Sequence, residues 1–247
     1  MKRMAGTTAE LARVLYGNDV LSGIMAGFAP GEVYAFKDDF ETYHATNRWT
    51  AVPASTGSLA LEATAPHGGQ IKMLTAATDN DSTIMKAPVS FVGLAGRRMA
   101  FEVRLMLTEG ATDKAAVVVG LASDQAATLM QADAGGPCAN YSGVIFFKVK
   151  GGTKWQFETS NGTTQTTDAD VGARTSASWI RLGAVLEPSA DGLSYSVTPY
   201  VDGAQAGEPQ ELLLASLAVL GLTVLVKAHS AAVETLHVDY VMAVADR

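Results

Sequence analysis

The 247-residue chain contains a single cysteine, Cys138. A disulfide needs two thiols, and a cysteine-based zinc site needs several. An internal disulfide and such a zinc site are therefore excluded, and folding must depend on packing. The length suits one large β domain or two small domains, either of which buries a full core without covalent staples.

Charged residues are scarce, and basic residues are the scarcer kind. Asp, Glu, Lys and Arg make up 17 % of the chain, against a usual share of about 25 %. The 18 Lys and Arg against 25 Asp and Glu give a net charge of −7, which argues against a nucleic-acid partner. With 48 % hydrophobic residues the chain is not disordered, and its weakly charged surface suits wide contacts with protein partners.

Long hydrophobic runs are also missing. The longest uncharged apolar stretch, residues 212–226, is shorter than the roughly 18 to 20 residues that span a bilayer, so we expect buried elements there and no membrane partner. Residues 1–3 carry the positive charge of a signal peptide, but Glu10, Arg13 and Asn18 interrupt the apolar core that such a signal needs. We therefore expect no secretion signal.

The usual catalytic motifs are absent. The sequence has no Gly-x-Gly phosphate loop, no Gly-x-Ser-x-Gly elbow and no His-Glu-x-x-His zinc motif. The histidines, His44, His67, His229 and His237, are scattered along the chain, which is typical of surface or hydrogen-bonded histidines rather than catalytic ones. We predict no catalytic residue, no cofactor and no enzymatic activity.

Two pairs of aspartates are close enough in the sequence to be candidate carboxylate sites, Asp168 with Asp170 and Asp79 with Asp81. Asp168 and Asp170 follow a Thr-rich strand and precede Val171-Gly172, so we expect them to close a turn rather than to act as the paired carboxylates of a glycosidase. Residues 79–83, Asp-Asn-Asp-Ser-Thr, are rich in the oxygen ligands that calcium prefers. They lack the glycine and the distant Glu of the helical calcium loop, so a polar surface loop is the favoured interpretation and no metal site is predicted.

Sugar binding would need exposed aromatic rings. Trp49 and Tyr141 lie in loosely patterned segments and are candidate glycan platforms. Trp155 is a further candidate, although its alternation with Phe157 is also typical of core packing.

Residues 1–33 differ from the rest of the chain. Thr7 and Glu10 have the spacing of a capping box, which predicts a short amphipathic helix, and Gly31 after Pro30 ends the helical pattern. One apolar stripe cannot form its own core, so this arm is expected to dock on its own domain or on a partner. The predicted contact residues are Leu11, Val14, Leu15, Leu21, Ile24 and Met25.

Residues 34–247 have the period of two that is typical of β-strands. Residues 99–108 alternate strictly, and residues 180–186 and 193–201 flank an Asp191-Gly192 turn. We expect Leu193, Tyr195, Val197 and Val201 to line one face of the second of these strands. Residues 143–167 predict a three-stranded meander. In the last strand we expect Leu236, Val238, Tyr240, Met242 and Val244 to face inward. About a dozen short strands without long helices predict an all-β antiparallel jelly-roll sandwich.

Three segments carry a family resemblance. The segments Phe-Lys-Asp-Asp-Phe-Glu at 36–41 and Thr-Leu-His-Val-Asp-Tyr-Val at 235–241 resemble the first and last strands of concanavalin A-like lectin/glucanase jelly rolls, where these strands are neighbours in one sheet. Residues 178–183 and 197–203 resemble the "W-x-R-L … Y-V-D-G" hairpin of that family. The chain lacks the paired-glutamate strand of the family's enzymes and the calcium cluster of its lectins.

A short arm followed by one such domain is similar to virion structural proteins of tailed bacteriophages, several of which resemble head decoration or cement proteins. This resemblance implies a non-enzymatic protein that binds the major capsid protein on the outer surface of the assembled head, often as a homotrimer. It also implies synthesis in the host cytoplasm. A tail or fibre component and a glycan-binding module remain as alternatives, and a glycoside hydrolase is the least favoured class.

Overall fold

The computed structural model describes residues 33–44, 48–53, 56–62, 69–88, 90–123, 126–133 and 135–247. The six apolar residues predicted to make partner contacts, Leu11, Val14, Leu15, Leu21, Ile24 and Met25, lie outside these ranges, and so does His67.

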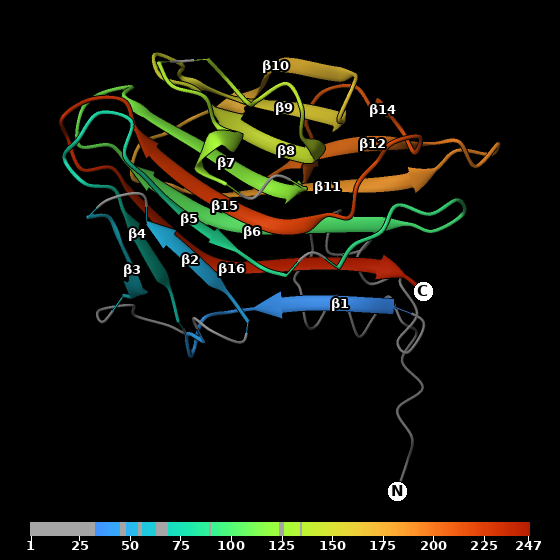
Figure 1. Cartoon of the computed structure of the whole chain (residues 1–247), viewed down its shortest axis with the longest axis horizontal. Coiled ribbons are helices and arrows are strands. Elements are labelled where there is room, and N and C mark those ends of the chain that lie inside the picture. Colours follow the sequence, from blue (N-terminus) through green and yellow to red (C-terminus); the bar gives the residue numbers. More distant parts are fainter. Residues whose placement is uncertain are drawn as a thin grey trace, which may run out of the picture.

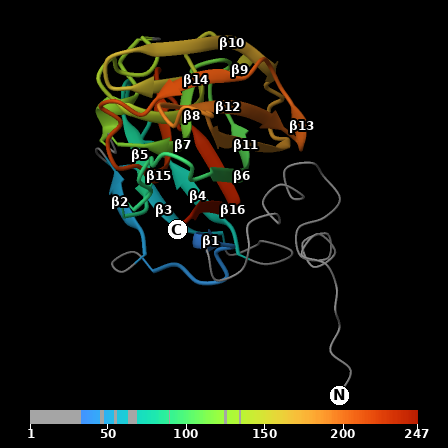
Figure 2. The same cartoon turned by 90° about the vertical axis from the view of Figure 1, so that its right-hand side faces the viewer.

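The described chain forms two antiparallel sheets, which confirms the prediction of an all-β sandwich (Figure 1). Sheet A has the order β13-β12-β11-β6-β16-β4-β3, with β1 also paired to β16 and β14 to β12. Sheet B has the order β10-β9-β8-β7-β15-β5-β2. In Figure 2 the strands of sheet B from β8 to β2 lie on the left and those of sheet A from β11 to β16 on the right, as two packed layers.

The strands of sheet A are β1 (Val33–Asp38), β3 (Ser58–Leu61), β4 (Ile71–Leu74), β6 (Met99–Thr108), β11 (Trp179–Pro188), β12 (Ser194–Val201), β13 (Ala204–Gln205), β14 (Gln210–Leu213) and β16 (Thr235–Asp246). Those of sheet B are β2 (Thr50–Pro53), β5 (Ser82–Lys86), β7 (Ala115–Ala122), β8 (Ser142–Lys148), β9 (Lys154–Asn161), β10 (Gln165–Ala173) and β15 (Gly221–Ala228). A short 3-10 helix, η1 (Ala127–Leu129), lies between β7 and β8.

The main core lies between the sheets. The alternation predicted for residues 99–108 is that of β6, whose inward residues Phe101, Val103 and Leu105 are fully buried. Phe101 meets Phe146 of sheet B edge-on at 6.3 Å between ring centroids, and Phe146 packs on Phe157 at 4.9 Å. Aromatic residues of both sheets therefore interlock at the centre of the sandwich.

The first and last strands of the domain are neighbours, as the family resemblance implies. β1 pairs with β16 over its whole length, from Val33 opposite Asp246 to Asp38 opposite Val241. The predicted hairpin of residues 180–201 is also confirmed as β11 and β12. The prediction for Leu193 is wrong: it does not share the buried face of Tyr195 and Val197. It precedes β12 and is 66 % exposed, because the chain is still turning at this position.

The predicted inward face of the last strand is right only for its first half. Leu236 and Val238 are in the core, but a β-bulge between Val238 and Tyr240 shifts the register against β6. After the bulge the core residues are Val241, Ala243 and Ala245, while Met242 and Val244 join a separate cluster on the outer face of sheet A. An extra residue in one strand reverses its alternation, which is why the sequence pattern misled.

A second apolar cluster covers the outer face of sheet B. Leu129, Met130 and Tyr141, from the segment between β7 and β8, pack on strand residues that include Ile145 and Phe147. The ammonium of Lys227 at the end of β15 donates to the Met130 carbonyl at 2.9 Å and holds this segment in place. The outer face of sheet B is therefore packed rather than an open groove where this segment lies.

Trp49 closes the core at the turn between β1 and β2. Its ring is 1 % exposed and packs edge-on against Phe36 at 5.1 Å. Its indole N–H donates to Asp38 Oδ2 at 2.7 Å, and Asp38 Oδ1 accepts the backbone N–H of Phe40 at 3.0 Å. The indole thus supplies both apolar packing and a satisfied buried hydrogen bond.

We predict that Trp49→Ala lowers the free energy of unfolding by about 3–5 kcal/mol, as expected for removing a fully buried aromatic side chain. Urea unfolding followed by far-UV circular dichroism measures the loss. Trp179→Ala, at a half-buried tryptophan, serves as the control and should cost less. A loss for Trp49→Ala within about 0.5 kcal/mol, the usual range of surface substitutions, would contradict this assignment.

Candidate functional site

Four loops meet at one end of the sandwich, on the left of Figure 1. They are residues 75–81, 109–114, 149–153 and 229–234, and we call this region the polar end. Backbone hydrogen bonds join the loops: the His229 N–H donates to the Lys114 carbonyl at 3.0 Å, and the Gly151 N–H donates to the Asp113 carbonyl at 2.6 Å. Residues far apart in the sequence are thereby held side by side.

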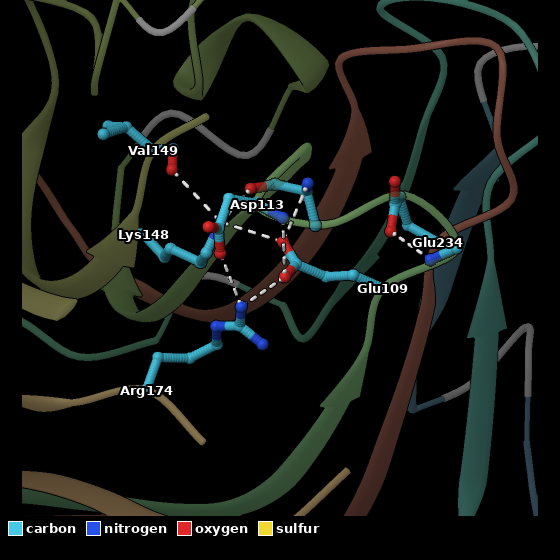
Figure 3. Close-up of polar contacts among 8 residues, drawn as sticks. Glu109, Asp113, Lys148, Val149, Arg174 and Glu234 are labelled. Carbon is cyan, nitrogen blue, oxygen red and sulfur yellow. Dashed lines mark hydrogen bonds and ion pairs between the residues drawn. The ribbon is translucent and has the colours of Figure 1, made fainter. Parts of the chain in front are cut away.

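A buried ion cluster occupies the polar end (Figure 3). The Lys148 ammonium lies 2.9 Å from Glu109 Oε1, and the Arg174 guanidinium lies 2.5 Å from Glu109 Oε2 and 2.7 Å from an Asp113 oxygen. The side chains of Lys148, Glu109 and Arg174 are 0 %, 3 % and 8 % exposed. Glu109 follows β6 of sheet A, whereas the two cations come from β8 and from the end of β10 in sheet B, so the cluster bridges the two layers.

Lys148 and Glu109 of this cluster have further hydrogen-bond partners in the backbone. Lys148 also donates to the backbone carbonyls of Ala115 at 2.8 Å and Val149 at 3.2 Å. Glu109 also accepts the backbone N–H groups of Asp113 and Ala115. Burial lowers the pKa of Lys148, and the hydrogen bond and charge of Glu109 oppose that shift. A lysine with three acceptors and no access to water stabilises structure and is poorly placed to act on a substrate.

Glu234 extends the polar contacts of this end. Its residue is fully buried, and its Oε2 accepts the Gly110 N–H at 2.9 Å. Burial raises the pKa of this carboxyl, the Gly110 hydrogen bond opposes the shift, and the nearby Glu109 reinforces it. Glu234 therefore carries an electrostatic cost when it is ionised.

The structure separates the predicted Asp79–Asp81 pair. Asp81 is buried and its Oδ2 accepts the Ala76 N–H at 2.5 Å, so it braces its own loop. Asp79 is exposed. One of its carboxylate oxygens, one of Asp133 and a ring nitrogen of His229 all lie within 4.8 Å of one another. The sequence placed Asp79 in a polar loop but gave no signal that Asp133 and His229 would join it.

Asp168 and Asp170 do not close a turn, contrary to expectation. Both lie within β10, next to a shift in its register against β9 between Asp168 and Gly172. Asp168 Oδ1 accepts the Asp170 N–H at 3.1 Å, and Asp170 forms an ion pair with Lys154. The irregular strand, rather than a turn, brings these two carboxylates together.

The three candidate glycan platforms are all interior residues, and this corrects the prediction. Trp49 and Trp155 are 1 % exposed and Tyr141 is 0 % exposed. Trp155 faces the core from β9. Tyr141 belongs to the apolar cluster on the outer face of sheet B, and its hydroxyl donates to Glu158 at 2.8 Å. None of the three presents a ring to a sugar. The alternation of Trp155 with Phe157 was the signal for burial.

An exposed apolar surface lies at the opposite end of the sandwich and was missed by sequence reasoning. Its members come from the loops before β6, between β11 and β12, and around β14. We call it the apolar end patch, formed by Val92, Leu94, Leu193, Leu213 and Val219, which are 41–66 % exposed.

Hydrogen bonds hold the loops of the apolar end patch together. A bridge pairs Phe91 with Leu220, which places Val92 opposite Val219. The Tyr195 hydroxyl bonds the backbone of Leu94 at 3.0 Å, and the Leu214 N–H donates to the Leu193 carbonyl at 2.9 Å. The patch is therefore a fixed surface built from three segments. No single stretch of the sequence contains it, which explains why it was not predicted.

Comparison with known proteins identifies the fold. No family model and no curated protein matches the chain. Solved structures that are similar include an endo-1,3-beta-glucanase from Streptomyces sioyaensis (13 % identity, 88 % of this chain and 98 % of that chain, TM-score 0.59). An endo-beta-1,4-glucuronan lyase from the fungus Trichoderma reesei is also similar (12 %, 84 % and 94 %, TM-score 0.60), as is peanut lectin (9 %, 87 % and 98 %, TM-score 0.56). The chain thus has the concanavalin A-like jelly-roll fold, which enzymes and lectins share.

We predict that Lys148→Met lowers the free energy of unfolding by about 3 kcal/mol, because it leaves a buried carboxylate without one of its two cations. Lys154→Met is the matched control: its ion pair with Asp170 is half exposed, so its loss should cost no more than about 1 kcal/mol. Adding Glu109→Gln to Lys148→Met should recover part of the stability. Equal losses for Lys148→Met and Lys154→Met in urea unfolding would refute this role for the cluster.

We also predict a pH-dependent effect of Glu234→Gln. The raised pKa means that the folded protein holds this proton more tightly than the unfolded chain does, so this group's contribution to stability is lost as the pH rises through the folded pKa. Glutamine stays neutral and still accepts from Gly110. The variant should match the wild type near about pH 4 and be the more stable of the two at about pH 7. Urea unfolding across this range measures the difference, and a difference that shrinks with rising pH would be the wrong sign.

Proposed function

We propose that this chain is a non-enzymatic structural protein of a bacteriophage virion, a capsid decoration protein that binds the outer surface of the assembled head. The observation that carries the proposal is the apolar end patch, because five large aliphatic side chains are fixed in an exposed position on one end of the domain. Contiguous exposed apolar surface of this kind marks a site of protein contact.

The entry point of the N-terminal arm supports the same orientation. Val33, where β1 begins, lies opposite Asp246. Asp246 bonds Arg98 through its backbone N–H and its carboxylate at 3.0 Å, and the Arg97 N–H donates to the Leu94 carbonyl at 3.1 Å. The arm therefore joins the domain at the end that carries the apolar end patch. Val33 and the apolar end patch thus lie at the same end of the domain, where the proposed contact with the capsid is made.

A non-enzymatic role agrees with the chemistry of the described residues. At the polar end, the buried cations Lys148 and Arg174 are both bonded to Glu109. The outer face of sheet B is covered where Leu129, Met130 and Tyr141 pack on it. Asp168 and Asp170 are tied to a backbone N–H and to Lys154. These groups have structural partners in place of substrate.

The proposed mechanism is stabilisation by mass action. A protein that binds the assembled head and not the free capsid subunits lowers the free energy of the assembled state with each bound copy. The net charge of −7 disfavours contact with the packaged genome and fits an outer position. Binding as a homotrimer at a symmetry axis belongs to this proposal, and a tail or fibre position is its alternative within the virion.

The direct test is mass spectrometry of purified particles of the phage whose genome encodes this chain, combined with cryo-electron microscopy of the same particles. The expected result is the chain on the outside of the head. Its absence from the particles would refute a virion role, and density on the tail would replace the head by the alternative position.

We predict that Leu193→Asp weakens binding to heads that lack the protein about tenfold or more, because it places a charge at the most exposed residue of the apolar end patch. Val233→Asp is the matched control, since Val233 is 42 % exposed but lies in the 229–234 loop at the polar end. Co-sedimentation with heads measures binding, and thermal unfolding verifies that both variants fold. If Val233→Asp loses binding and Leu193→Asp retains it, the protein docks by its other end.

A further inference from the structure

One nitrogen of a buried histidine at the polar end has no hydrogen-bond partner. His229 is 2 % exposed, and its ring is fixed by the contact of Nδ1 with Asn80 Oδ1 at 3.1 Å. Because an amide oxygen only accepts, Nδ1 carries the proton in this contact, and Nε2 presents a lone pair. This Nε2 is buried and unpartnered, which is costly for a polar atom unless something binds it.

Two carboxylates lie next to this ring. Asp79 comes from the β4–β5 loop and Asp133 from the segment between β7 and β8, and their oxygens and a His229 nitrogen lie within 4.8 Å of one another. Asn80 orients both neighbours, since its amide nitrogen donates to Asp79 Oδ2 at 3.3 Å while its oxygen holds the imidazole. Asn80 thus acts as the outer partner that usually accompanies a metal-binding histidine.

Two lysines are also near this group. The Lys150 ammonium lies 3.5 Å from an Asp133 oxygen, and Lys227 donates to the Met130 carbonyl. They offset part of the negative charge of the aspartates. Neither is a hydrogen-bond partner of Nε2. A buried imidazole with a free lone pair and two carboxylates therefore lie within 4.8 Å of one another, an arrangement that a cation between them would relieve.

We propose that Asp79, Asp133 and His229 bind a divalent transition-metal ion of the zinc or manganese type. One imidazole nitrogen and two carboxylate oxygens suit such ions, whereas calcium takes six to eight oxygen ligands. Metal–ligand distances of about 2.0–2.2 Å require the two carboxylates to move slightly inward, which their exposed side chains permit. Water completes the coordination.

This site would clamp three loops. Asp79, Asp133 and His229 belong to separate connections, and the segment that carries Asp133 also covers the outer face of sheet B. An ion bound there would hold that cover to the ends of β5 and β15 and stabilise the fold by linkage. The proposal concerns metal binding alone and does not depend on a virion role.

The experiment is isothermal titration of the full chain, after EDTA treatment and dialysis, with ZnCl₂, MnCl₂ and CaCl₂ in turn. We expect one equivalent of zinc or manganese to bind and calcium to bind more weakly. Asp79→Asn and Asp133→Asn, which are isosteric changes at exposed residues, should each weaken binding at least about tenfold, and Asn80→Gly about tenfold through loss of the outer partner. Glycine suits position 80 because Asn80 has a φ of 62°.

Two controls separate this site from other metal ligands. Asp168→Asn, at a half-buried carboxylate of β10, and Cys138→Ser, at the single thiol, should leave the affinity unchanged. No saturable binding of zinc or manganese, or equal affinity in the wild type, Asp79→Asn and Asp133→Asn, would overturn the proposal. Tighter binding of calcium than of zinc and manganese would overturn the assignment of the metal class.

Discussion

The buried contact of Glu109 with Lys148 and Arg174 determines how the two sheets meet. Glu109 belongs to the end of β6 in one layer, and the cations belong to the other layer. A charge removed from water is tolerated only beside its partner, so the end of β6 cannot slide relative to β8 without exposing a carboxylate to an apolar interior. An apolar side chain can pack against another apolar neighbour at little cost, whereas a buried carboxylate needs its cation. It fixes the relative position of the sheets, and the loops of the polar end follow from that position.

The two ends of the sandwich have opposite chemistry. At the polar end, Glu109 is turned inward and is paired with the buried Lys148 and Arg174. At the other end, Leu94, Leu193 and their neighbours are turned outward, although hydrogen bonds such as that of the Tyr195 hydroxyl hold their loops rigidly. Exposing a leucine side chain to water is unfavourable, and a rigid loop cannot move to bury it. The domain is therefore asymmetric along its strands, with one end suited to contact and the other closed on itself.

The fold could be predicted because strand alternation is visible in the sequence. The candidate sites could not, because their residues come together only in the folded structure. The alternation in residues 99–108 and the turn at Asp191-Gly192 report local geometry, so β6 and the β11–β12 hairpin could be predicted. The burial of Tyr141 depends on Glu158 and on the segment that covers sheet B, and the group of Asp79, Asp133 and His229 depends on three loops. No sequence window contains such information. The bulge of β16 shifts the pairing by one residue between Val238 and Tyr240. Nothing in the composition of the strand marks this position, so the bulge could not be predicted either.

That bulge also shapes the folding landscape of the last strand. The strand has apolar residues on both sides of its alternation, so a pairing without the bulge would place Tyr240, Met242 and Val244 in the core and turn Val241 and Ala243 outward. The two pairings compete with similar hydrophobic gain. The native one is selected by polar contacts beside the bulge: Asp239 bonds Arg104 at 2.5 Å, and the Tyr240 hydroxyl donates to Glu102. Polar contacts on the outside of the sheet thus favour the pairing that places Val241, Ala243 and Ala245 inside it.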